Sequence, residues 1–213
     1  MPYGYLGQNQ PNQTVNNSGV FSITDVAELQ SQGKLGGSLE LIAEQTASSD
    51  SAIDFLSIQE DVYDVHLLQV NNYQANSDNT ILTIKLYESG VLETGSVYQY
   101  AIQGGRSNGT FSEYKSTGSS LGVSIIGSGI DNASNSSANG YTYFYNLGNS
   151  SKYSFTTFQW SYIYYPVTED YEFNFGGGVL PQASLVNGFR VIPNGGTFSA
   201  NLKLYGVKQL WVL

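Results

Sequence analysis

The most regular stretch of the chain reads Thr197-Phe198-Ser199-Ala200-Asn201-Leu202-Lys203-Leu204-Tyr205-Gly206-Val207. Apolar side chains at positions 198, 200, 202 and 204 alternate with polar ones. Successive side chains of a β-strand point to opposite faces, so this spacing predicts a strand with one buried row and one outward row. A strand this regular needs partner strands and a facing layer, which a β-sandwich supplies.

Shorter segments of the same kind precede this strand. In residues 81–87 we expect Leu82, Ile84 and Leu86 to point inward, and residues 65–70 are apolar on both faces, which predicts a central strand. Further strands are expected at residues 39–42, 52–56, 98–102, 121–126, 141–145, 153–160 and 188–192. About ten such segments without a helix-length period predict an all-β fold, an antiparallel β-sandwich of jelly-roll type. We expect this domain to span residues 38–213.

Segments rich in Gly, Ser and Asn are interpreted as connections. They are residues 103–120, residues 127–140, and a long irregular segment 162–187 that contains Gly176-Gly177-Gly178. The run Pro193-Asn194-Gly195-Gly196 predicts a turn that joins strand 188–192 to strand 197–207 as a hairpin.

Composition and charge exclude several classes of protein. Only 12% of the 213 residues are charged, while Gly (24) and Tyr (17) are abundant, which is typical of short strands joined by turns. The net charge is −9 and the eight basic residues are scattered, so we expect no binding to nucleic acid. Cysteine is absent, which excludes disulfides and thiolate chemistry. No apolar run reaches the ~20 residues of a membrane-spanning helix, so we expect no membrane insertion.

Residues 1–37 differ from the rest and are interpreted as an extended attachment arm, rich in Gln, Asn and Gly and without a secretory signal. The run Ser22-Ile23-Thr24-Asp25 predicts the start of a short helix that Gly33 ends. Burying an apolar side chain contributes roughly 1.5–3 kcal/mol, whereas ordering the backbone costs ~1–2 kcal/mol per residue. We therefore expect the arm to pack on partner chains through its apolar residues, which are Leu6, Val15, Val20, Phe21, Ile23, Val26 and Leu29.

Candidate reactive groups are few. His66 is the single histidine and lies in an apolar strand, and no Gly-x-Ser-x-Gly elbow supports a catalytic triad, so we interpret it as structural. Two acidic groups, Glu60-Asp61 with Asp64 and Glu169-Asp170 with Glu172, are candidates for Ca²⁺ ligands or an acid/base pair. Neither has the spacing of a defined metal loop, and we interpret both as solvated. We expect no catalytic residues, no metal and no cofactor.

An aromatic cluster supplies the candidate binding residues. Its members are Tyr141, Tyr143, Phe144, Tyr145, Phe155, Phe158, Trp160, Tyr162, Tyr164 and Tyr165. Alternate members are expected in the core. The outward members, above all Tyr162, Tyr164 and Tyr165 beside Pro166, are candidates for protein contact or loop packing, with carbohydrate stacking as a third alternative.

Several stretches together resemble a known family. The run Gly19-Val20-Phe21-Ser22-Ile23, followed by Glu28-Leu29 and Gln32-Gly33-Lys34, is similar to a segment near the start of many bacteriophage tail-associated proteins. The domain resembles a virion protein type of marine phages, of the cyanophage and pelagiphage kind. The stretches that carry this resemblance are Leu39-Glu40-Leu41-Ile42, Tyr63-Asp64-Val65-His66, Tyr98-Gln99-Tyr100-Ala101, Tyr141-Thr142-Tyr143-Phe144-Tyr145 and Leu204-Tyr205-Gly206-Val207-Lys208.

The resemblance implies a non-enzymatic structural component of a phage particle, made in the host cytoplasm and located in the virion. It favours a tail fibre or tail appendage, in which the arm binds other virion proteins and the sandwich serves assembly or host attachment, with a host surface glycan as a possible ligand. The apolar residues of the arm, the low charge and the many tyrosines predict a homo-oligomer, and phage fibres favour a trimer. A capsid-decorating protein and a polysaccharide-degrading enzyme remain as alternatives.

Overall fold

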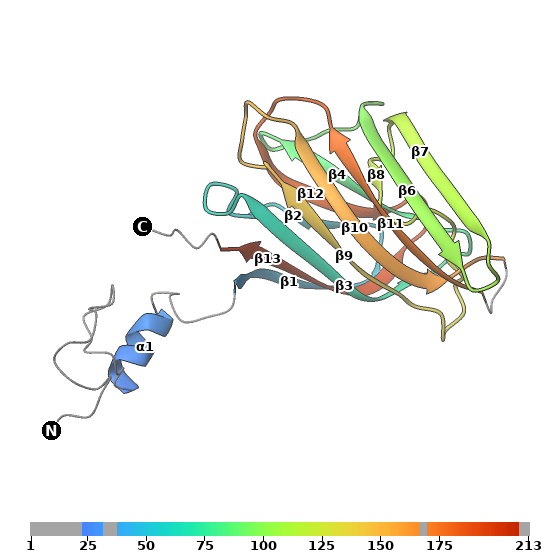
Figure 1. Cartoon of the computed structure of the whole chain (residues 1–213), viewed down its shortest axis with the longest axis horizontal. Helices are drawn as coiled ribbons and strands as arrows, with labels where there is room; N and C mark the ends of the chain where they lie inside the picture. The colour runs from blue at the N-terminus through green and yellow to red at the C-terminus, as the bar shows by residue number, and fades with distance from the viewer. Residues whose placement is uncertain (1–22, 32–37, 167–169, 209–213) are drawn as a thin grey trace, which may run out of the picture. The chain divides into compact units, whose positions relative to one another are not determined.

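The computed structural model describes residues 23–31, 38–166 and 170–208 (Figure 1). These residues contain thirteen strands and one short helix, and the strands form two antiparallel sheets packed against each other. The structure therefore confirms the predicted all-β, jelly-roll-like sandwich. Among the described residues no helix is both long and apolar enough to span a bilayer.

The sheets differ in size. The larger has eight strands in the order β1 (Leu39–Asp50), β13 (Phe198–Val207), β3 (Val65–Ala75), β9 (Ala138–Tyr145), β10 (Ser154–Ile163), β11 (Tyr171–Leu180), β6 (Tyr98–Arg106) and β7 (Phe111–Ser119). The smaller has five, of which four follow the order β2 (Ile53–Phe55), β12 (Val186–Pro193), β4 (Leu82–Glu88) and β5 (Val91–Leu92). The fifth, β8 (Val123–Ser124), pairs with β4.

Period-two alternation predicted the most regular strands correctly. Along β13 the inward row, Phe198, Ala200, Leu202 and Leu204, is at most 4% exposed. This strand lies between β1 and β3, and β3 in turn lies between β13 and β9, as expected for a central strand. The predicted inward row of β4 is buried as well.

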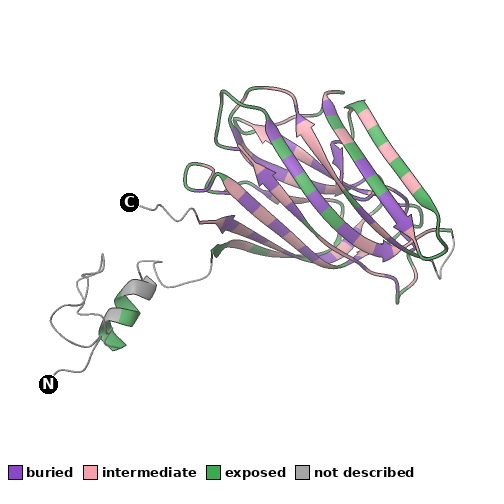
Figure 2. Cartoon of the chain, in the orientation of Figure 1, coloured by how far each residue is buried: buried purple, intermediate pink, exposed green. Residues whose placement is uncertain are grey.

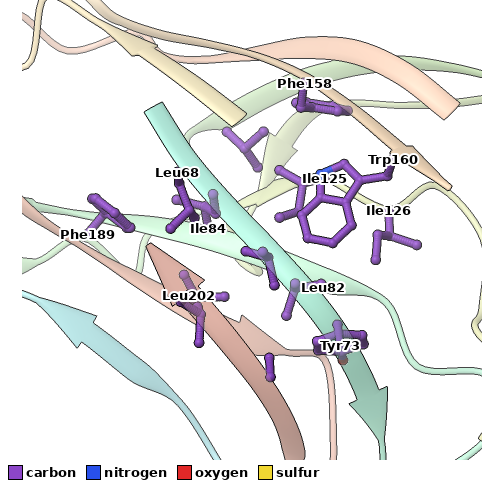
Figure 3. Packing of buried hydrophobic residues seen from close by; sticks show 14 of the residues in the cluster. Leu68, Tyr73, Leu82, Ile84, Ile125, Ile126, Phe158, Trp160, Phe189 and Leu202 are labelled. Carbon is purple, nitrogen blue, oxygen red and sulfur yellow. The ribbon is translucent and has the colours of Figure 1, made fainter. Parts of the chain in front are cut away.

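Buried hydrophobic side chains of both sheets pack together in one core, among them Phe189, Phe158 and Trp160 (Figure 3). Phe189 of the small sheet stacks on Phe55 of the same sheet, with 4.9 Å between ring centroids, and on Phe144 of the large sheet, with 4.6 Å. Stacked rings at these distances add to the free energy of area burial, so the three-ring stack fixes how the layers face each other.

Two of the predicted connections are wrong, because they are strands. Residues 103–106 continue β6, residues 111–119 form β7, and the glycine run lies inside β11. The glycines are needed for close approach between strands. A Cβ on Gly176 would lie 2.3 Å from the carbonyl oxygen of Ala101, and a Cβ on Gly178 would lie 2.5 Å from Cγ1 of Val123. A composition typical of loops therefore reflects tight packing at these positions.

The predicted hairpin between residues 188–192 and 197–207 is also wrong. β12 belongs to the small sheet and β13 to the large one, so the segment between them crosses from layer to layer. Asn194 holds the crossing, since its side-chain oxygen accepts from the N–H of Ile81 at 3.0 Å and its own N–H donates to the Ile81 carbonyl at 3.0 Å. The turn was correctly located, but turn residues do not reveal which sheet the chain enters next.

The helix expected near the N-terminus is present as α1 (Ile23–Ser31). By its internal contacts the chain divides into two units, Met1–Glu40 and Leu41–Leu213. Within α1, Ile23 is 91% exposed and Val26 is 41% exposed. The other expected arm residues, Leu6, Val15, Val20 and Phe21, and the side chain of Leu29 lie outside the described part of the chain.

Candidate functional site

The outward side of the large sheet carries a field of aromatic and amide side chains. Figure 2 shows buried and exposed positions alternating along β10, and the same alternation in β3, β9 and β11 sends every second side chain outward. We call the resulting surface the aromatic–amide face. It consists of Leu67, Gln69, Asn71, Asn139, Tyr141, Tyr143, Tyr145, Thr157, Gln159, Ser161, Tyr171, Phe173 and Phe175.

The register of the strands sorts this face into columns. β9 presents tyrosines and the first half of β11 presents aromatic rings. The middle of β10 presents the polar residues Thr157, Gln159 and Ser161, although Phe155 nearer its start also points outward, and β3 presents Gln69 and Asn71 beside Leu67. One row across the strands shows the pattern fully, because Gln69 pairs with Tyr141, Tyr141 with Gln159, Gln159 with Phe175, and Phe175 with Gln103. Paired outward side chains on neighbouring strands have Cβ atoms about 5 Å apart, so Tyr141 and Phe175 in this row are each flanked by amide groups.

Three tyrosines at every second position of β9 form what we call the tyrosine column, Tyr141, Tyr143 and Tyr145. Their ring centroids are separated by 5.8 Å and then 6.4 Å. The hydroxyl of Tyr141 donates to Oε1 of Gln159 at 3.1 Å, and the hydroxyl of Tyr145 is 3.0 Å from that of Thr157. In Tyr141 and Tyr145, contacts on both the ring and the hydroxyl restrict the side chain before any ligand arrives.

Two hollows lie against the tyrosine column. The first has a volume of about 580 Å³ and extends from β3, where Leu67, Gln69 and Asn71 line it, as far as Tyr171 of β11. The second, of about 470 Å³, extends toward β11 and is lined there by Phe175. Tyr141, Tyr143 and Gln159 line both hollows, so these three residues form the ridge between them.

The face is uncharged. No outward position of β3, β9, β10 or β11 carries Asp, Glu, Lys or Arg. The nearest charges in the same row belong to flanking strands, where Lys203 pairs with Gln69 and Glu113 with Gln103. Both are already in ion pairs, Lys203 with Glu44 at 3.3 Å and Glu113 with Lys115.

The predicted binding tyrosines lie elsewhere. Tyr162 was expected to point outward, and that expectation is wrong, because it is 2% exposed. Its hydroxyl donates to Oε1 of Glu172 at 2.9 Å, and burial with this neighbouring carboxylate raises the pKa of the phenol. Tyr162 lies two residues after the core residue Trp160, so the two-residue period of the strand places it on the buried face of the sheet. Tyr164 and Tyr165 are half-buried, and the Arg106 guanidinium lies 3.4 Å from the Tyr164 ring centroid.

Glu172 was expected to be solvated and is fully buried instead. The Nε–H of Arg106 donates to its Oε2 at 2.7 Å, so both carboxylate oxygens have partners within the core side of the sheet. Its neighbours on β11, Tyr171 and Phe173, point to the opposite face. Asp170 accepts from the side-chain amide of Asn108 at 2.6 Å, and Glu169 lies outside the described residues.

The remaining candidates form no reactive site in the described structure. His66 is fully buried, its Nε2 is 2.8 Å from the Ile58 carbonyl oxygen, and burial lowers the pKa of the imidazole. Asp61 and Asp64 are exposed and Glu60 is half-buried. Within residues 23–31, 38–166 and 170–208, no three His, Asp or Glu side chains gather so as to hold a metal ion.

Comparison with known proteins adds little. No protein-family model and no curated protein matches the chain. Among solved structures, a fructofuranosidase variant from Schwanniomyces occidentalis complexed with fructosylnystose is similar at 8% identity, over 82% of this chain and 35% of that chain, with a TM-score of 0.21. A likeness at that TM-score carries no argument about this protein.

Proposed function

We propose that this protein is a non-enzymatic carbohydrate-binding attachment component of a bacteriophage particle. The observation that carries the binding role is the alternation of aromatic and amide side chains in the row Gln69, Tyr141, Gln159 and Phe175, on the uncharged outward side of β3, β9, β10 and β11. Sugar rings have apolar C–H faces that pack on aromatic rings, and their hydroxyls exchange hydrogen bonds with amides, which offer both donors and acceptors. The aromatic–amide face supplies both groups side by side.

The rings on this face suit recognition for a second reason. Tyrosine provides a large, rigid contact surface with few rotatable bonds, so little conformational entropy is lost when it binds. The contacts from Tyr141 to Gln159 and from Tyr145 to Thr157 reduce that loss further. Phe175 on β11 is 51% exposed and adds a further ring that is accessible to a ligand.

Binding without cleavage is favoured over hydrolysis. Most glycoside hydrolases use two carboxyl groups that flank the scissile bond. The outward positions of β3, β9, β10 and β11 carry no carboxylate, and Glu172 on β11 points to the core, where Arg106 and Tyr162 hold it. A polysaccharide-degrading enzyme is therefore the less supported alternative.

The assignment to a phage particle rests on the resemblance of the sequence to phage tail-associated and virion proteins. A short helix that exposes Ile23 and Val26 also supports an attachment arm, because so short a helix is marginal in water without a surface to pack on. Within the particle we propose a tail fibre or tail appendage. A capsid-decorating protein fits the same arm and sandwich.

The binding role is tested with the full chain on an array of soluble polysaccharides, read by affinity electrophoresis. We expect retardation by at least one polysaccharide, loss of that retardation in Tyr141→Ala, and no effect of Val91→Ala. Val91 is a suitable control because it is 71% exposed on the small sheet, remote in topology from the tyrosine column. Absence of retardation across the array contradicts the binding role, and release of shorter oligosaccharides contradicts its non-enzymatic character.

The location in the particle needs a separate test. The chain has no cysteine, so Ser107→Cys in the exposed turn of residues 107–110 creates a unique site for a thiol-reactive gold label. In electron micrographs of phage particles we expect label at the tail. Label spread over the capsid shell excludes a tail appendage and supports the capsid-decorating alternative.

A further inference from the structure

We infer that the carbohydrate bound at the aromatic–amide face is an uncharged, extended chain that crosses the tyrosine column and occupies both hollows. This inference rests on the proposed carbohydrate-binding function and adds two features to it, the chemical class of the glycan and its course over the sheet. Each feature is carried by its own observation.

The course follows from the position of the hollows. The first hollow includes Gln69 and Asn71 of β3 and reaches Tyr171 of β11, and the second includes Phe175 of β11. Both are lined by the ridge of Tyr141, Tyr143 and Gln159. A linear molecule that fills both must pass over β9 and β10, across the strands. Neighbouring strands are about 4.8 Å apart, so the span from β3 to β11 covers three spacings, roughly 14 Å. A monosaccharide cannot fill that span, whereas an oligosaccharide can.

The side chains along that path match what an extended glycan presents. At the β3 end Gln69 and Asn71 offer amide groups, the ridge offers the Tyr141 ring, and at the β11 end Phe175 offers a second exposed ring. Tyr141 and Phe175 are both paired with Gln159 and therefore lie two strand spacings apart, about 9–10 Å. This separation suits stacking on two sugar rings that are not adjacent in the chain.

The absence of charge determines the class of glycan. An anionic polysaccharide on this face loses part of its hydration without gaining a cationic partner, because the outward positions beneath it carry none. The net charge of −9 also repels polyanions over longer distances. The one lysine in the central row, Lys203, is already paired with Glu44. A neutral glycan needs no cationic partner and is not repelled by the negative net charge.

The experiment uses the full chain and two matched series of oligosaccharides. One series contains neutral β-1,4-linked glucose, mannose or galactose oligomers from two to six units. The other contains the corresponding uronic acids, which differ only by a carboxylate at C6. Affinities are measured by isothermal titration calorimetry for the unaltered protein and for Gln69→Ala, Tyr141→Ala and Phe175→Ala, with Val91→Ala as control.

We expect binding of a neutral series, rising with length up to four or more units, and at least about tenfold weaker binding of its acidic counterpart. For the neutral hexamer, Gln69→Ala and Phe175→Ala should each weaken binding, and Tyr141→Ala should weaken it by about tenfold, as expected for the loss of a ring contact. For the dimer, Gln69→Ala and Phe175→Ala should not both have an effect, because a dimer does not reach both hollows.

The contrary results are distinct from one another. Equal or tighter binding of the uronic acids overturns the neutral class and leaves the proposed function standing. An effect of only one of Gln69→Ala and Phe175→Ala on the hexamer overturns the course across the tyrosine column. If neither series binds, while light scattering shows that Tyr141→Ala abolishes self-association, the face is an interface between copies of the chain, and both the inference and the carbohydrate-binding function fail.

Discussion

Gly140 on β9 lies directly opposite Trp160 on β10, and the indole occupies the space that a side chain at position 140 would need. A Cβ placed on Gly140 would be 2.4 Å from Cδ2 of Trp160. The indole itself is 1% exposed and belongs to the core, so it has little room to move. Both residues also line the first hollow, so this pair lies at the boundary between that hollow and the core.

The first prediction concerns that pair. Gly140→Ala should lower the free energy of unfolding by about 1–3 kcal/mol, because the added methyl group overpacks a buried indole. Urea denaturation followed by tryptophan fluorescence measures the change. Gly195→Ala is the matched control, since no atom lies within 4 Å of a Cβ at that position. Equal stability of both variants contradicts the prediction.

The second prediction concerns the buried ion pair of Glu172 and Arg106. Glu172→Gln should lower the free energy of unfolding by roughly 3 kcal/mol, because the guanidinium keeps its charge and loses its partner. Chemical denaturation measures the loss. The exposed pair of Glu113 with Lys115 supplies the control, and Glu113→Gln should leave stability unchanged. A variant at position 172 as stable as the control variant would falsify the structural role of this pair.

The third prediction concerns pH. Hydrogen bonds from Arg190 lower the pKa of Asp54. Partial burial of the carboxyl raises this pKa, and a hydrogen bond from Tyr87 lowers it. A carboxylate with a lowered folded-state pKa stabilises the fold above its unfolded pKa of about 3.9 and loses that contribution as the pH falls through the folded pKa. Asp54→Asn should therefore be less stable than the unaltered protein at pH 7, and the difference should shrink below about pH 4. A difference that stays constant down to pH 2 argues against this linkage.

The fourth prediction separates the two contributions of Tyr141. Tyr141→Phe keeps the ring and removes the hydrogen bond to Gln159, so affinity for a bound neutral hexasaccharide should fall by roughly threefold, less than in Tyr141→Ala. Calorimetric titration measures both values. Thermal unfolding should be nearly unchanged in the two variants, because the side chain is 40% exposed. Identical affinities of the two variants indicate that the ring makes no contact with the sugar.

The most regular strands could be predicted because their alternation is a property of each strand alone. The inward rows of β4 and β13 follow directly from the order of their residues. By contrast, β7 and β11 were assigned to loops, since their Ser and Gly content is typical of turns. Only the neighbouring strands show why Gly176 and Gly178 are glycines, and those neighbours come from distant parts of the sequence.

The candidate site was only partly accessible from the sequence. The predicted aromatic cluster includes the tyrosines of β9, but the prediction names Tyr162 as a binding residue. Tyr162 lies two positions after the buried Trp160, so the period of the strand places it in the core. Gln69, Gln159 and Phe175 were not singled out. Their relation to Tyr141 depends on the register of four strands, and a local pattern does not contain that register.

The alternation along β10 has a consequence for how this protein can change over time. Phe158 and Trp160 maintain the core, while the adjacent residues Thr157 and Gln159 point to the outward face. Substitutions at the outward positions can therefore alter the proposed glycan recognition without disturbing the packing that keeps the domain folded. If the protein attaches to a cell surface as proposed, such separation allows the specificity of attachment to diversify on a constant scaffold. Sequence variation among related chains should then concentrate at every second residue of β3, β9, β10 and β11.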